Sequence, residues 1–293
     1  MRAIEAALLA DRPLLLRGEP GVGKTQFAQA VAKALERAFV SKTVGVLTEA
    51  HALLWEEDHV GRLAEAQLAS VLSQQDVAVV RGRLRIARFV RPGPLWWTFN
   101  WDDACNHMER NGIEEIDDAR RAAGAKGVVV LIDEIDKAET ALPNALLEAL
   151  GSRVIRPPGC EPVSAASKPL IILASNQLRP LSAAFMRRCL SHRIRLPKGD
   201  ALVEHLVVLG QAHFPKHAVP DATDELLKQA AQFVAGDRAA LAEKSVSPLP
   251  GVAEYIDLLS ALFDDARDPA VSATEALSLL RPYFLDKASD ASE

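Results

Sequence analysis

The sequence predicts an α/β protein with a parallel sheet flanked by helices, followed by a small all-helical domain. Two continuous apolar runs, at 127–132 (GVVVLI) and 169–174 (PLIILA), have the composition of strands that are buried on both faces. Segments with helical spacing of apolar residues lie between and around these runs. Because strands that alternate with helices are typical of a parallel sheet, we expect one sheet before residue 200.

The individual elements follow from periodicity and from the residues that bound each segment. In the first part of the chain we expect a helix at 3–10, strands at 13–17 and 43–47, and a helix at 25–39 between them. Around the two apolar runs we expect helices at 142–150 and 183–189 and a last strand at 192–196. The helical segments that follow are 201–212, 221–235, 250–265 and 273–285.

Composition limits the class of protein. With 49% apolar and 25% charged residues among 293, the chain has ample apolar surface for a folded core. The net charge of −5 argues against a generally basic nucleic-acid binder, although a local basic patch stays open. Without a signal peptide or an apolar run of about 18 residues, and with three dispersed cysteines, a cytoplasmic protein with no membrane span is expected.

A glycine-rich segment follows the first predicted strand. Residues 18–25, GEPGVGKT, match the G-x-x-x-x-G-K-[ST] phosphate loop. The glycines let successive backbone N–H groups point at phosphates, Lys24 adds a positive charge, and the Thr25 hydroxyl is a hard ligand for Mg²⁺. The candidate nucleotide-binding residues are Gly18, Glu19, Pro20, Gly21, Val22, Gly23, Lys24, Thr25 and Gln26.

Two carboxylates end the apolar run at 127–132. Acids at the carboxyl end of a buried strand project into the crevice where ligands bind in such sheets. Asp133 is therefore a candidate Mg²⁺ ligand, and Glu134 is a candidate general base for an attacking water. The alternative is that Asp133 only caps the following helix.

Four segments in this order carry a resemblance to a known family. GEPGVGKT, VVLIDEIDKA, LIILASN and AFMRRC resemble the Walker A, Walker B, sensor 1 and arginine-finger segments of AAA+ ATPases. PNALLEAL at 143–150 and RPGPL at 91–95 are similar to the MoxR-like branch of that superfamily. The resemblance covers about residues 3–200 and implies a P-loop NTPase core with a helical lid.

The resemblance also implies roles for particular residues. Asn176 would be sensor 1, and Arg188, with Arg187 beside it, would be the arginine finger that reaches a neighbouring subunit's nucleotide. The implied cofactors are ATP or ADP with Mg²⁺, and the implied assembly is a ring, such as a hexamer. One departure stands out, because Leu249 occupies the position where a sensor 2 arginine is expected, and Lys244 is the available substitute.

An insertion of about 49–126 separates the two Walker motifs and contains all four tryptophans, Trp55, Trp96, Trp97 and Trp101. The cluster after the Gly-Pro turn at 93–94 either forms a loop that grips a partner or packs the insertion onto the sheet. The arginines of 81–91 alternate with apolar residues, which predicts a strand with one basic face. That face either contacts nucleic acid or is a solvated, salt-bridged surface.

The expected organisation is a core at 1–200 that includes the insertion, a lid at 201–285 and a polar tail at 286–293. The leading function is an ATPase, stimulated by assembly or by a partner, that remodels a client or effector such as a von Willebrand A domain protein. A second hypothesis is a slow nucleotide-dependent switch or scaffold in a bacterial conflict or defence system. A third is a DNA-directed motor or loader, for which the arginines of 81–91 are the basis.

Overall fold

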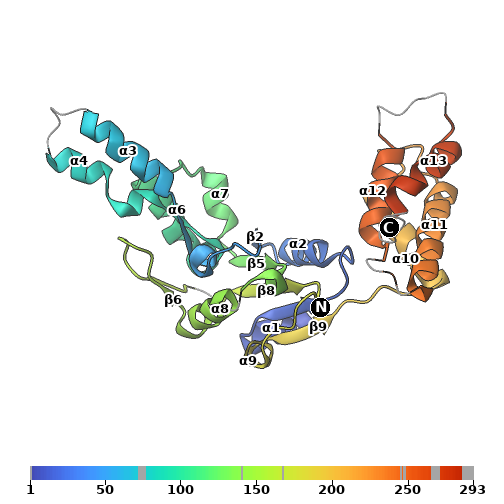
Figure 1. The fold of residues 1–293 in the computed structure, drawn as a ribbon, viewed down its shortest axis with the longest axis horizontal. Coiled ribbons are helices and arrows are strands. Elements are labelled where there is room, and N and C mark those ends of the chain that lie inside the picture. Colours follow the sequence, from blue (N-terminus) through green and yellow to red (C-terminus); the bar gives the residue numbers. More distant parts are fainter. Residues whose placement is uncertain are drawn as a thin grey trace. The chain divides into compact units, whose positions relative to one another are not determined.

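The computed structural model describes residues 2–71, 77–139, 141–166, 168–244, 246, 249–264 and 271–285. The expected polar tail at 286–293 lies outside these residues. The chain divides into two compact units, one of residues 1–17 and 25–193 and the other of residues 18–24 and 194–293 (Figure 1). The phosphate-loop residues 18–24 therefore group with the C-terminal helices rather than with the sheet.

The first unit is built on a five-stranded sheet in the order β2-β5-β8-β1-β9, in which every neighbouring pair is parallel. Two of its three inner strands, β5 (Val128–Asp133) and β8 (Leu170–Ser175), are the two apolar runs of the sequence. The other strands are β1 (Leu14–Arg17), β2 (Ala38–Thr43) and β9 (Leu190–Arg193). The predicted α/β fold with a parallel sheet flanked by helices is confirmed.

Four helices flank the sheet: α1 (Arg2–Ala10), α2 (Lys24–Ala34), α8 (Ala141–Ser152) and α9 (Ala183–Arg188). The insertion between β2 and β5 adds several short elements (Figure 1). They are η1 (Ala50–Leu53), β3 (Trp55–Glu57), α3 (His59–Val71), α4 (Val77–Arg83), η2 (Ile86–Phe89), β4 (Val90–Pro92), α5 (Pro94–Phe99), α6 (Trp101–Arg110) and α7 (Asp118–Ala123). After β5 come η3 (Ile135–Lys137) and the hairpin strands β6 (Val154–Ile155) and β7 (Val163–Ser164).

The second strand does not lie where the periodicity predicted it. Helix α2 ends at Ala34, the backbone reverses at Glu36 with φ +51°, and β2 covers 38–43. Phe39 and Val40 fit a helical period, but they pair with Val129 and Val130 of β5 instead. The predicted strand at 43–47 is wrong: Leu47 is 95% exposed, so its apolar side chain contributes nothing to the sheet.

The insertion corrects one further expectation and decides between two alternatives for the tryptophans. The arginine-rich segment 81–91 is not a strand with a basic face, because it passes through the end of α4, through η2 and into β4. The tryptophan cluster packs rather than projecting as a loop, since Trp96 in α5 is 1% exposed and its Nε1 donates to Asp103 at 2.8 Å. Trp97 and Trp101 pack ring against ring with centroids 4.8 Å apart.

In the second unit the described residues from 194 onward form four helices, as predicted: α10 (Asp200–His213), α11 (Asp224–Glu243), α12 (Val252–Leu262) and α13 (Ala273–Leu285). Helix α11 starts where the Thr223 side chain accepts from the Leu226 amide. It runs eight residues beyond its predicted end at 235. The bundle closes around buried residues such as Leu206, Leu227 and Tyr255.

Candidate nucleotide site

The glycine-rich loop before α2 is curled around its own lysine. Lys24 Nζ donates to the carbonyl oxygens of Gly18 at 3.1 Å and Glu19 at 2.8 Å, and the residue is only 6% exposed. Gly21 and Gly23 have φ of +73° and +88°, which glycine adopts at no steric cost. The loop therefore has the concave backbone that phosphate binding requires, with a cation held inside it.

The glycine-rich loop also lies very close to other segments of the same polypeptide. A Cβ on Gly18 would lie 2.8 Å from the carbonyl oxygen of Ile194, and one on Gly21 would lie 3.1 Å from the Ala253 side chain. Glu19 forms an ion pair with Arg238 of α11. Glycine is therefore required here by the surrounding protein as well as by the curled backbone.

A hydroxyl and a carboxylate meet at the carboxyl edge of the sheet. Thr25 Oγ1, in the first turn of α2, donates to Asp133 Oδ2 at 3.0 Å. The second Asp133 oxygen accepts from the backbone amide of Glu134 at 2.8 Å, and the N-cap residue of the following η3 is Glu134 rather than Asp133. The alternative that Asp133 caps that helix is thus not what the structure shows. Two adjacent hard oxygen donors are the chemistry that Mg²⁺ prefers.

Glu134 and Asn176 come from neighbouring strand ends and lie together. Glu134 has a left-handed backbone with φ +58°, which directs its side chain out of the strand's regular alternation. One carboxylate oxygen lies 3.5 Å from Asn176 Nδ2, and the other pairs with Lys137 Nζ at 2.9 Å. The structure thereby places a carboxylate and an amide side by side at the same sheet edge as Asp133.

Asp136 is a residue of this edge to which the sequence argument assigned no role. It is 2% exposed, and its two oxygens accept from the backbone amides of Asn176 at 3.2 Å and Leu178 at 2.8 Å. A buried carboxylate that receives two amide hydrogen bonds fixes the chain that follows β8. The signal for Asp136 in the sequence was its position as a charged residue directly after the apolar Ile135, within the Walker B segment.

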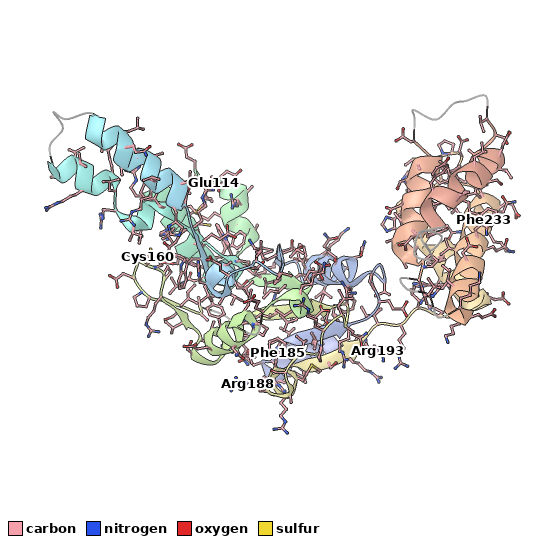
Figure 2. All side chains as sticks on the ribbon, viewed as in Figure 1. Glu114, Cys160, Phe185, Arg188, Arg193 and Phe233 are labelled. Carbon is pink, nitrogen blue, oxygen red and sulfur yellow. The ribbon has the colours of Figure 1, made fainter. Side chains whose placement is uncertain are left out.

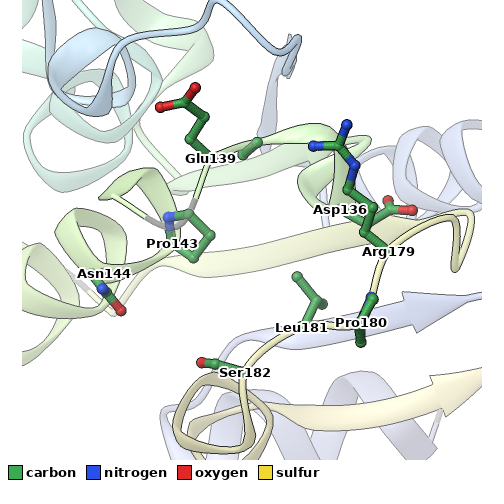
Figure 3. Close-up of a pocket in the computed structure, with 9 residues that line it drawn as sticks. Asp136, Glu139, Pro143, Asn144, Arg179, Pro180, Leu181 and Ser182 are labelled. Atoms are coloured by element: carbon green, nitrogen blue, oxygen red, sulfur yellow. The ribbon is translucent and has the colours of Figure 1, made fainter.

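A cavity of about 470 Å³ opens beside Asp136, between the start of α8 and the segment that enters α9 (Figure 3). Arg179 and Glu139 line it together with Asp136, so both signs of charge face it. Its remaining lining residues are Ala138, Pro143, Asn144, Pro180, Leu181 and Ser182. The cavity borders the sheet edge that holds Asp136, but neither Glu134 nor Asn176 lines it.

The two arginines predicted as fingers lie in the last turn of α9, and both are exposed. Arg12 fixes this turn, because its guanidinium donates to the carbonyl oxygens of Arg187 and Arg188. Figure 2 labels Arg188 at the periphery of the first unit. Among the described residues, no hydrogen bond or ion pair joins either guanidinium to Glu134 or Asn176.

Gln26, and the sensor 2 candidates Lys244 and Leu249, do not take part in the hydrogen bonds and ion pairs given above for the described part of the chain. Lys244 is the C-cap residue of α11, where its amide donates to Ala240. The residues before Leu249, at 245, 247 and 248, lie outside the described residues.

An all-parallel sheet with a glycine-rich loop between β1 and α2 defines a P-loop fold. Residues 13–189 match the family model of the AAA domain, dynein-related subfamily, and this match covers more than half of the chain. The chain therefore belongs to the AAA domain family and is an AAA+ ATPase by family, a class that binds nucleotides.

Solved structures are similar to the chain at low sequence identity. A protein from Cytophaga hutchinsonii, provisionally assigned as an ATPase, is 14% identical with a TM-score of 0.45, and the match covers 96% of this chain and 78% of that one. A mutant of RuvB from Thermotoga maritima is 16% identical with a TM-score of 0.45, covering 95% and 67%. No curated protein sequence matches. No helix in the described part of the chain is long and apolar enough to cross a membrane.

Proposed function

We propose that this protein is a MoxR-like AAA+ ATPase that hydrolyses ATP at subunit interfaces in order to remodel or activate a partner protein. The observation that carries the proposal is the group of Thr25, Asp133, Glu134 and Asn176, in which hydrogen bonds of 2.8–3.5 Å join each residue to the next. Family membership and the order of the motifs support it.

Each residue of the group has a chemical role in the proposal. The amides of the loop and Lys24 hold the phosphates. Thr25 and Asp133 fit Mg²⁺ and would hold it, and the ion supplies positive charge for the phosphate oxygens. Glu134 accepts the proton of the attacking water, and Asn176 orients that water. Asp136 acts as a positioning residue for Asn176 through its backbone amide.

The exposed arginines suggest how the site is completed. Arg188, with Arg187 as its neighbour, would reach the nucleotide of an adjacent subunit and neutralise charge that develops in the transition state. Such an arrangement requires a homo-oligomer, for which a hexameric ring is the proposed form. The rigid hold of Arg12 on the end of α9 supports this, because a finger must be held in place.

The partner would be a protein, such as a von Willebrand A domain protein or another effector, because the sequence shows no effector motif of its own. We keep the division into a core at 1–200 with its insertion at 49–126 and a lid at 201–285. A cytoplasmic location is also part of the proposal, supported by Cys105, Cys160 and Cys189, which are all free thiols.

A slow nucleotide-dependent switch is the second candidate function. Leu249 at the expected sensor 2 position favours it, and so does Lys137, which pairs with the proposed general base at 2.9 Å. We do not propose the DNA-directed motor, because its basis was a strand with a basic face, and residues 81–91 do not form one.

Steady-state ATP hydrolysis measured against protein concentration, with sizing in parallel, tests the proposal. Turnover per subunit should rise as the assembly forms. The Glu134→Gln variant should keep nucleotide affinity and lose hydrolysis, since an amide cannot accept the water's proton. Stable nucleotide binding by a monomer with negligible turnover would select the switch, and unchanged turnover in Glu134→Gln would remove Glu134 from the mechanism.

A further inference from the structure

Glu19 connects the phosphate loop to the helical bundle through two different groups. Its backbone carbonyl accepts from Lys24 Nζ at 2.8 Å, and its carboxylate pairs with the guanidinium of Arg238 on α11. Arg238 also donates to the Pro250 carbonyl at 2.9 Å, just before α12. The Arg238 side chain is only 14% exposed, so it is held between the loop and the start of that helix.

The negative charge of Glu19 is unfavourable at such a place. A carboxylate on a loop that receives phosphates repels them, and the repulsion is weakly screened where the counter-charge is partly buried. Arg238 lies in direct contact with that carboxylate and cancels its charge. The loop can therefore carry Glu19 without losing its attraction for an anion.

We propose that Arg238 is a positioning residue that neutralises Glu19 and thereby sets the nucleotide affinity of the phosphate loop from the helical bundle. The inference rests on the proposed function, because it concerns the same nucleotide site. It gives α11 a way to affect nucleotide binding that does not require an arginine at position 249. Arg238 acts through Glu19 rather than through the phosphates, which distinguishes this role from direct contact with the nucleotide.

A double-mutant cycle separates these two roles. Arg238→Met should weaken the binding of a fluorescent ATP analogue by roughly tenfold, the order expected for a unit charge left uncompensated near phosphates at the effective dielectric of a protein surface. Glu19→Gln should change binding by no more than about threefold, because Arg238 already cancels the charge that the substitution removes. The double variant should return to within about threefold of the wild type.

Two controls keep the cycle interpretable. Arg238→Lys retains the charge and should bind far better than Arg238→Met. Lys228→Met removes a positive charge from an exposed position on the same helix and should leave binding unchanged. Thermal unfolding of every variant without nucleotide identifies any variant that does not fold. If Arg238→Met does not fold, Arg238→Lys and the double variant still test the inference, because both leave no uncompensated carboxylate and should bind within about threefold of the wild type.

The outcomes distinguish failure of the inference from failure of the proposed function on which it rests. Rescue of Arg238→Met by Glu19→Gln supports the inference. Additive losses, with the double variant no tighter than Arg238→Met, would overturn it and leave the phosphate site intact. If Lys24→Ala binds the analogue as tightly as the wild type, the phosphate site itself is wrong and the inference falls with it.

Discussion

Replacing Asp136 with asparagine tests whether a buried carboxylate positions Asn176, one of the residues that we propose for hydrolysis. The aspartate receives two backbone amide hydrogen bonds, from Asn176 and Leu178. Hydrogen bonds to a charged acceptor contribute about 1.5–3 kcal/mol each, and an unsatisfied buried polar group costs about 1–3 kcal/mol. Asn keeps one acceptor oxygen and turns an NH₂ group toward the other amide, so the free energy of unfolding should fall by about 3 kcal/mol.

The effect on catalysis should be separable from the effect on stability. Loss of one hydrogen bond that orients the Asn176 segment, about 1.4 kcal/mol in the transition state, corresponds to a tenfold fall in kcat. Nucleotide affinity should stay within about twofold, because the hydrogen-bond partners of Asp136 are the amides of Asn176 and Leu178, which are not part of the phosphate loop. Urea unfolding, steady-state hydrolysis and equilibrium binding give the three quantities.

An exposed aspartate provides the matched control. Asp102→Asn makes the same chemical change on the surface of the same unit and should alter neither stability nor turnover. If Asp136→Asn loses stability but hydrolyses ATP at the wild-type rate, Asp136 only supports the fold and our account of the Asn176 segment is wrong.

Three further predictions follow from the site and the core. Lys24→Ala should abolish thermal stabilisation by ATP, and a full shift in the variant would exclude Lys24 from phosphate binding. Arg188→Ala should lose turnover but regain it in mixed assemblies that supply an intact finger; no recovery on mixing would argue against action in trans. Burial raises the pKa of the Cys189 thiol to about 11 from 9.0, so folding stability should fall as pH rises from about 9 to about 11. Burial also raises the pKa of the Cys160 thiol to about 11, so Cys189→Ala should reduce this dependence without abolishing it. An unchanged dependence in urea unfolding would show that Cys189 does not contribute.

The parts of this protein that sequence predicted best are those whose signal is local. The apolar runs of β5 and β8 and the motif between Gly18 and Thr25 each specify their structure within a few neighbouring residues. The boundary between α2 and β2 was missed because Phe39 and Val40 suit either element, and only pairing with β5 decides between them.

The contacts that the sequence did not predict join residues that are far apart in the chain. The Arg238–Glu19 pair joins residues 219 positions apart, and nothing in either local segment indicates the other. The same holds for Asp136, whose partners follow a strand some 40 positions later. The proposed roles of Arg187 and Arg188 involve a neighbouring subunit, so no property of the single chain determines them.

The contact at Gly18 has a consequence for how this protein can change over time. Its Cα faces the carbonyl of Ile194, where the chain passes from the sheet toward the bundle, at a spacing that excludes any side chain. A glycine at position 18 is therefore required for two independent reasons, the proposed phosphate binding and the close approach of the backbone at Ile194. A variant that no longer bound nucleotide would still meet the same clash at position 18, so a glycine here is by itself weak evidence of catalysis.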